Sequence, residues 1–282
     1  MIVNLGFMQG RLSPIENNQI QSFPWDNWEH EIAYADKLGF NIIEWTLDQE
    51  NIYSNPFMNT EGQTKIKMLK KSNNVSIESL TADCFMQAPF WKSENTNEKK
   101  MLQDIFIDVI SAAKKLDIKY IIVPLVDNGS IDSASQEDDL VNFLISIEKI
   151  LGNTKILFES DLPPKKLEKF IGKFSEQYFG INYDTGNSAS LGYDPAEEFF
   201  AYGNRILNVH LKDRPLGGST VPLGEGDTDF SKIFNLLSNK NYSSNLILQA
   251  ARAKDDNHDQ ALLQYKNYIF NVLKKNGIKH KR

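Results

Sequence analysis

Four side chains with metal-binding chemistry each follow a short apolar run in the second half of the chain. Glu159 follows ILF, Asp184 follows INY, His210 follows NV, and Gln249 follows LIL. Carboxylate oxygens, an imidazole nitrogen and an amide oxygen suit divalent cations such as Mn²⁺, Mg²⁺, Co²⁺ or Zn²⁺, and a set without cysteine is unlike a structural zinc site. A cation held in this way can bind vicinal oxygens of a polyol, polarise a carbonyl and stabilise an enediolate.

The elements that must position these groups are short segments rich in Ile, Val and Leu, separated by longer segments of helical spacing. Such alternation predicts parallel strands that are buried on both faces. Eight units without a linker predict one α/β domain, a (β/α)₈ TIM barrel over residues 1–282. The rival, a doubly wound sheet, would usually carry a glycine-rich nucleotide motif, and the sequence has none. The expected strands are 2–7, 40–45, 75–80, 118–124, 155–159, 179–184, 206–211 and 245–249.

Catalytic groups of such barrels lie at the carboxyl ends of the strands and in the loops that follow. Because neighbouring strands lie about 4.8 Å apart, side chains from four successive strand ends can converge on one point. The candidate catalytic residues are Glu159, Gln249 and Lys212, the last of which follows the seventh strand. Three arginines among the further candidates could clamp a phosphate through two parallel hydrogen bonds. The candidate substrate contacts are Gln9, Arg11, Glu44, Trp45, Asn187, Arg214, Glu225 and Arg252.

Four motifs link the second half of the chain to a known family: FES at 158–160, DTGN at 184–187, VHLKD at 209–213 and PLGEGD at 222–227. Together they resemble the xylose-isomerase-like TIM barrels, and most of all the sugar and sugar-phosphate isomerases and epimerases, such as the ketose and L-ribulose-5-phosphate 3-epimerases. The resemblance covers most of residues 155–253. It implies a metal held by Glu, Asp, His and Glu from strands 5 to 8, with the two glutamates as the acid–base pair.

Carried over by position, the first three ligands are Glu159, Asp184 and His210, whereas Gln249 stands where the fourth ligand should be glutamate. An amide oxygen can still bind a metal, but an amide does not take up a proton near neutral pH. Glu159 is then the principal base, and inversion at a carbon needs a second base from elsewhere. The candidates for that base are Glu44, Asp83 and Glu225.

The expected function is therefore a divalent-metal-dependent isomerase or epimerase that acts on a small sugar or sugar phosphate through an enediolate. An inosose-dehydratase-like lyase and a degenerate, non-catalytic sugar-binding barrel stay open. An apurinic-site endonuclease shares the fold, but the net charge of −6 disfavours nucleic acid as a partner.

Composition sets further expectations. The sequence has no apolar run long enough for a membrane span, and its start is unlike a signal peptide. One cysteine, Cys84, allows no disulfide within the chain, so a cytoplasmic protein is expected. A homo-oligomer is an expectation from the family resemblance alone. The basic end, residues 275–282, is expected to fray.

Overall fold

A closed ring of parallel strands forms the centre of the computed structural model, which describes residues 2–15 and 21–280. The barrel strands are β1 (Ile2–Met8), β2 (Ile42–Thr46), β3 (Ser76–Thr81), β4 (Tyr120–Leu125), β5 (Lys155–Ser160), β6 (Phe179–Asp184), β7 (Ile206–Leu211) and β8 (Asn245–Leu248). They pair in chain order, and β8 pairs with β1 to close the ring. The predicted single (β/α)₈ barrel is confirmed.

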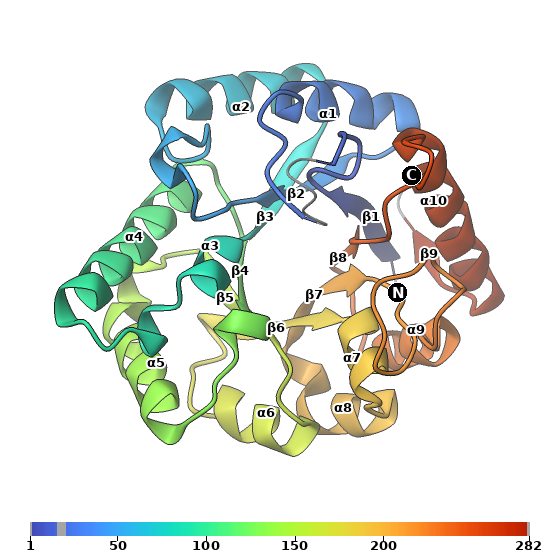
Figure 1. Cartoon of the computed structure of the whole chain (residues 1–282). Helices are drawn as coiled ribbons and strands as arrows, with labels where there is room; N and C mark the ends of the chain where they lie inside the picture. The colour runs from blue at the N-terminus through green and yellow to red at the C-terminus, as the bar shows by residue number, and fades with distance from the viewer. Residues whose placement is uncertain (1, 16–20, 281–282) are drawn as a thin grey trace.

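Helices surround the strands as an outer ring (Figure 1). They are α1 (Trp28–Ala35), α2 (Thr60–Ser72), α3 (Asp83–Gln87), α4 (Thr96–Lys115), α5 (Ala134–Ile147), α6 (Pro164–Ile171), α7 (Thr185–Leu191), α8 (Pro195–Tyr202), α9 (Phe230–Asn239) and α10 (His258–Lys275). The short helix α3 lies inside the ring of longer helices in this view. Among the described helices, none combines the length and apolarity needed to cross a membrane.

The strands place apolar and polar side chains on opposite faces. In β6, Ile181 and Tyr183 belong to the apolar core, whereas Asn182 and Asp184 alternate with them. Because successive side chains of a strand point to opposite faces, the two polar residues share the face opposite the apolar core. The same alternation in β7 places His210 on the polar face. The barrel interior is therefore polar toward its carboxyl end.

The basic end that the sequence predicts to fray is described as far as residue 280. Helix α10 continues to Lys275, and a short strand, β9 (Lys279–His280), pairs with β1. Ile278 is buried in the apolar core immediately before β9. Its burial anchors the segment, which composition alone marked as a solvated basic end. Residues 281–282 lie outside the described part of the chain.

Candidate functional site

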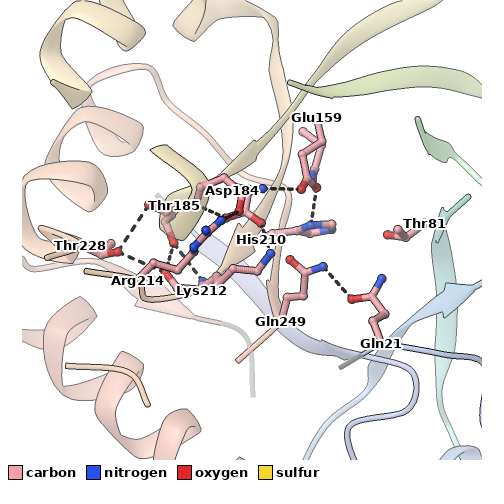
Figure 2. Close-up of polar contacts among 12 residues, drawn as sticks. Gln21, Thr81, Glu159, Asp184, Thr185, His210, Lys212, Arg214, Thr228 and Gln249 are labelled. Atoms are coloured by element: carbon pink, nitrogen blue, oxygen red, sulfur yellow. Dashed lines mark hydrogen bonds and ion pairs between the residues drawn. The ribbon is translucent and has the colours of Figure 1, made fainter. Parts of the chain in front are cut away.

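The side chains predicted to bind a metal meet at the carboxyl end of the barrel. Glu159, Asp184 and His210 come from β5, β6 and β7, and one ligand atom of each lies within 4.8 Å of the others. All three are buried, and so is Gln249, which directly follows β8. In Figure 2 the Gln249 amide approaches His210 from the side away from Glu159.

The donor atoms of this cluster fit a divalent cation. Asp184 Oδ2, His210 Nδ1 and Gln249 Oε1 are buried, and among the described residues Gln249 Oε1 has no hydrogen-bond partner. The first two have only close charged neighbours, Lys212 Nζ at 2.8 Å and Glu159 Oε2 at 2.9 Å. Because buried polar atoms normally have a partner, the unpartnered amide oxygen beside a carboxylate and an imidazole suits a site for a cation.

Glu44 lies beneath His210 and is fully buried. Its Oε1 accepts hydrogen bonds from His210 Nε2 and Thr81 Oγ1, both at 2.6 Å. Its Oε2 accepts from Ser79 Oγ at 2.6 Å and Asn208 Nδ2 at 2.9 Å. A carboxylate on one nitrogen of a histidine orients the ring so that the other nitrogen faces the metal. Glu44, which the sequence predicts as a substrate contact, lies among the strands with its carboxylate enclosed and bonded to His210.

Two asparagines continue this network to Glu159. Asn208 Nδ2 donates to Asn182 Oδ1 at 2.8 Å, and Asn182 Nδ2 donates to Glu159 Oε2 at 2.8 Å. Together with the two contacts of His210, these bonds close a ring of five buried side chains through Glu44. Sequence analysis missed both asparagines. The available signal was their position two residues before Asp184 and His210, on the same face of each strand.

The carboxylates around His210 set the charges of the cluster. Burial lowers the pKa of His210, but Glu44 and Glu159 outweigh it and raise the pKa to about 10. Burial raises the pKa of Glu159, whereas its hydrogen bond to His210 and the charges of His210 and Lys212 bring the pKa below its usual value. Glu159 is therefore ionised at neutral pH, as a general base must be. A cation at His210 Nδ1 has to displace the proton held there.

The DTGN motif at 184–187 organises one side of the cluster. Asp184 Oδ1 accepts from the Asn187 backbone N–H at 2.8 Å, and Asn187 Nδ2 donates to Glu159 Oε1 at 2.9 Å. A Cβ atom on Gly186 would lie 2.7 Å from Lys212 Cγ. Glycine at this position therefore leaves room for the lysine, whose Nζ faces Asp184.

The VHLKD and PLGEGD motifs are joined by Asp213, which is fully buried. Its Oδ2 accepts from the backbone N–H groups of Gly224 at 2.7 Å and Gly226 at 3.0 Å, and its Oδ1 accepts from that of Thr228 at 3.1 Å. A Cβ atom on Gly226 would lie 2.3 Å from Asp213 Oδ1. The two motifs belong together because one carboxylate folds the loop that follows Lys212.

Gln21 connects three other groups of the site and was also missed from the sequence. Its Oε1 accepts from Arg11 Nη2 at 3.2 Å and from Gln249 Nε2 at 2.8 Å, and its Nε2 donates to Asp83 Oδ2 at 2.5 Å. Because Arg11 can only donate, it fixes which end of the Gln21 amide accepts. Gln249 must then turn its nitrogen toward Gln21, which leaves its Oε1 facing His210 and Lys212 (Figure 2).

A cavity of about 300 Å³ opens over the cluster. Three predicted substrate contacts line it: Arg11, Asn187 and Arg214. The guanidinium of Arg214 donates to Asn187 Oδ1 at 2.8 Å and to the Gly218 carbonyl at 2.9 Å. The lining also includes Glu159, Lys212, Gln249, Gln21 and Asp83.

The other predicted substrate contacts lie outside this lining. Gln9 is fully buried, and its Oε1 accepts from the Thr46 N–H at 3.3 Å. Trp45 is fully buried and packs against other aromatic rings. Glu225 and Arg252 line an adjoining groove, where Arg252 Nη1 donates to the Ser13 carbonyl at 2.9 Å. A position near a strand end therefore does not by itself show whether a side chain lines the cavity or is buried in the structure around it.

Comparison of the chain with known proteins shows which family it belongs to. The model of the xylose isomerase-like TIM barrel family matches residues 32–267. The chain belongs to that family. A protein of Escherichia coli (strain K12) proposed to be an L-ribulose-5-phosphate 3-epimerase, SgbU, is 22% identical over 259 residues, 86% of this chain and 90% of that protein.

Two other similar proteins carry different descriptions. An inosose dehydratase of Clostridium tetani is 28% identical over 153 residues, which cover 45% of this chain and only about half, 51%, of that protein. The crystal structure of the IOLI protein with a binding zinc atom superposes with a TM-score of 0.73 at 16% identity, over 97% of this chain and 99% of that chain. The barrel of this chain is therefore shared with proteins described as sugar epimerases and dehydratases.

Proposed function

We propose that this xylose isomerase-like barrel is a divalent-metal-dependent isomerase or epimerase that acts on a small sugar or sugar phosphate. The observation that carries the proposal is the cluster of Glu159, Asp184, His210 and Gln249, whose buried donor atoms face one another beneath a cavity of about 300 Å³. The zinc atom of the IOLI structure and the epimerase description of SgbU support it.

The four side chains would hold the cation, with Glu44 orienting His210 from below. A divalent cation bound there would polarise the substrate carbonyl and offset the charge that develops on its oxygen. Glu159, held by Asn182 and Asn187, would remove the proton from the carbon next to that carbonyl. The C–H electron pair would form the carbon–carbon double bond of the enediolate, and the carbonyl electrons would move to oxygen.

Cationic side chains extend from the cluster to the mouth of the cavity. Lys212 Nζ lies beside Asp184 and can donate to a substrate oxygen there. Arg214, two residues later in the sequence, lines the same cavity. Arg11 lines the cavity next to Gln21. Two guanidiniums and an ammonium in one cavity suit a substrate with several oxygens, including a phosphate.

An inosose-dehydratase-like lyase is the second candidate, because the match to the Clostridium tetani enzyme is 28% identical over 153 residues. Both reactions start when Glu159 removes a proton next to a carbonyl. In the lyase the enediolate then expels a neighbouring hydroxyl group as water, after that group has been protonated. The two functions therefore differ in product and share the enolisation step.

Solvent deuterium exchange tests the shared step. Purified protein, loaded with Mn²⁺ or stripped with EDTA, is incubated in D₂O with ketoses, aldoses, their phosphates and inososes, and proton NMR follows label and products. We expect metal-dependent exchange next to the carbonyl for at least one substrate. Glu159→Gln should abolish it, whereas Glu168→Gln, at an exposed position of α6, should not.

The products separate the candidates. A sugar of changed configuration or carbonyl position supports the isomerase or epimerase, and an unsaturated product that has lost water supports the lyase. If the metal-loaded wild type exchanges no label on any substrate, or if Glu159→Gln keeps full turnover, the proposed function is wrong.

A further inference from the structure

Inversion of a carbon centre needs proton-transfer groups on two faces of the substrate, and Glu159 serves only one. In the resembling enzymes a carboxylate at the end of the eighth strand serves the other face, but this chain has Gln249 there. The carboxylates named from the sequence as substitutes, Glu44, Asp83 and Glu225, occupy three different environments. Their positions decide among them.

Two of the three are excluded by their location. Both oxygens of Glu44 accept from groups inside the barrel, and the residue is absent from the cavity lining. Glu225 lines the adjoining groove with Arg252. Neither carboxylate faces the cavity above the metal cluster, where a substrate carbon would lie.

Of the three carboxylates, Asp83 lines the cavity above the metal cluster. It is the first residue of α3, separated from the end of β3 by one residue, and it lines the cavity together with Glu159 and Gln249. The Gln21 side chain links Asp83 Oδ2 to Gln249 Nε2 through hydrogen bonds of 2.5 Å and 2.8 Å. Asp83 is therefore one amide group away from the position where the family resemblance expects the second carboxylate.

The geometry points to Asp83 as the second proton-transfer group of this barrel, a carboxylate moved across Gln21 from position 249. This inference rests on the proposed function and narrows it to inversion by two different carboxyl groups, one on β5 and one after β3. In this inference Gln249 acts as a metal ligand and takes no part in proton transfer. Its Nε2 donates to Gln21, which leaves its Oε1 facing the metal cluster.

The proton balance is complete without another reactant. Glu159 takes the proton from one face as the enediolate forms. Asp83, in its acid form, gives a proton to the same carbon on the other face, and the carbonyl is restored. Glu159 and Asp83 then exchange protons with solvent to return to their starting states. Burial, with the Asp48 carboxylate adding to it, raises the pKa of Asp83 to about 7, so both of its forms are present near neutral pH.

The test uses the metal-loaded full chain and a substrate found in the deuterium exchange panel. For Asp83→Asn we expect inversion to fall by about 100-fold or more, while Glu159 still exchanges label into unreacted substrate. The control is Asp161→Asn, which changes another aspartate after a barrel strand, one whose side chain bonds Ser130 outside the cavity lining. It should invert as fast as the wild type.

A carboxylate swap distinguishes acid–base chemistry from a structural role. In D83N/Q249E the carboxylate returns to position 249, and Gln21 can turn its amide to donate to Glu and accept from Asn, at the cost of its Arg11 contact. We expect the inversion rate of this double variant to be at least tenfold higher than that of D83N.

Each other outcome has one meaning. Exchange that is absent from the wild type refutes the proposed function as a whole. The inference about Asp83 alone is overturned by wild-type exchange without inversion, by full inversion in D83N, or by a metal-binding swap variant that inverts no faster than D83N.

Discussion

Replacement of Asp83 by asparagine should stabilise the protein above neutral pH, although it removes a group of the site. Burial and then the Asp48 carboxylate raise the pKa of Asp83 from 3.8 to about 7. In the pH range between these values, the folded chain keeps a proton that the unfolded chain has released. The stability that this proton supplies is fully present below about pH 4 and is lost as the pH rises through about 7.

The size of the effect follows from linkage at about 1.4 kcal/mol per unit of pKa difference. Integrated from pH 5 to pH 8, the two pKa values imply a loss of about 2.5 kcal/mol in the free energy of unfolding. Asparagine does not titrate, and it can still accept the hydrogen bond from Gln21. The free energy of unfolding of Asp83→Asn, minus that of the wild type, should therefore increase by about 2.5 kcal/mol over this range.

Urea unfolding followed by circular dichroism at pH 5, 6, 7 and 8 measures this difference. EDTA must be present, because a bound cation would lower the pKa of a nearby carboxyl group. A difference that stays constant within about 0.5 kcal/mol, or that decreases with pH, would refute the electrostatic reasoning for Asp83.

Further predictions concern the metal cluster and its supports. Glu44→Gln should weaken Mn²⁺ binding about 10- to 100-fold in calorimetric titration, because His210 loses the carboxylate that orients it, and unchanged affinity would contradict this support. Binding of Mn²⁺ at pH 7.5 should release about one proton from His210, whose pKa is raised to about 10, and heats that are equal in buffers of different ionisation enthalpy would contradict it. Gln249→Glu should tighten Mn²⁺ binding about tenfold or more by adding a charge to the ligand set, and weaker binding would mean that position 249 does not face the ion. Gly226→Ala should destabilise the protein by about 1–3 kcal/mol, because its Cβ would meet Asp213, and an unchanged melting temperature would show that the loop yields at no cost.

The convergence of the candidate metal ligands could be predicted because it follows the geometry of the fold. Parallel strands of a closed barrel end at one edge, so Glu159, Asp184, His210 and Gln249 at successive strand ends have to meet. The apolar runs alone predicted the strand boundaries, and each predicted end lies within about two residues of the end in the structure.

The supporting residues could not be predicted because their partners are distant in the sequence. Gln21 bonds Asp83, 62 residues away, and Gln249, 228 residues away. Glu44 and Trp45 lie near a strand end, as a catalytic residue would. Position along the strand alone does not show whether a side chain faces the cavity or is buried in the packed interior. Pairing of β2 with β1 and β3 encloses Glu44, and that pairing is a property of the folded barrel.

Direct observation of the cation tests the central claim. Crystals of the full chain soaked with Mn²⁺ and measured at the manganese absorption edge should show one anomalous peak at the carboxyl end of the barrel. That peak should lie about 2.0–2.3 Å from oxygens of Glu159, Asp184 and Gln249 and from His210 Nδ1. A map without a peak between these four side chains, at a Mn²⁺ concentration that saturates binding in solution, would contradict this claim.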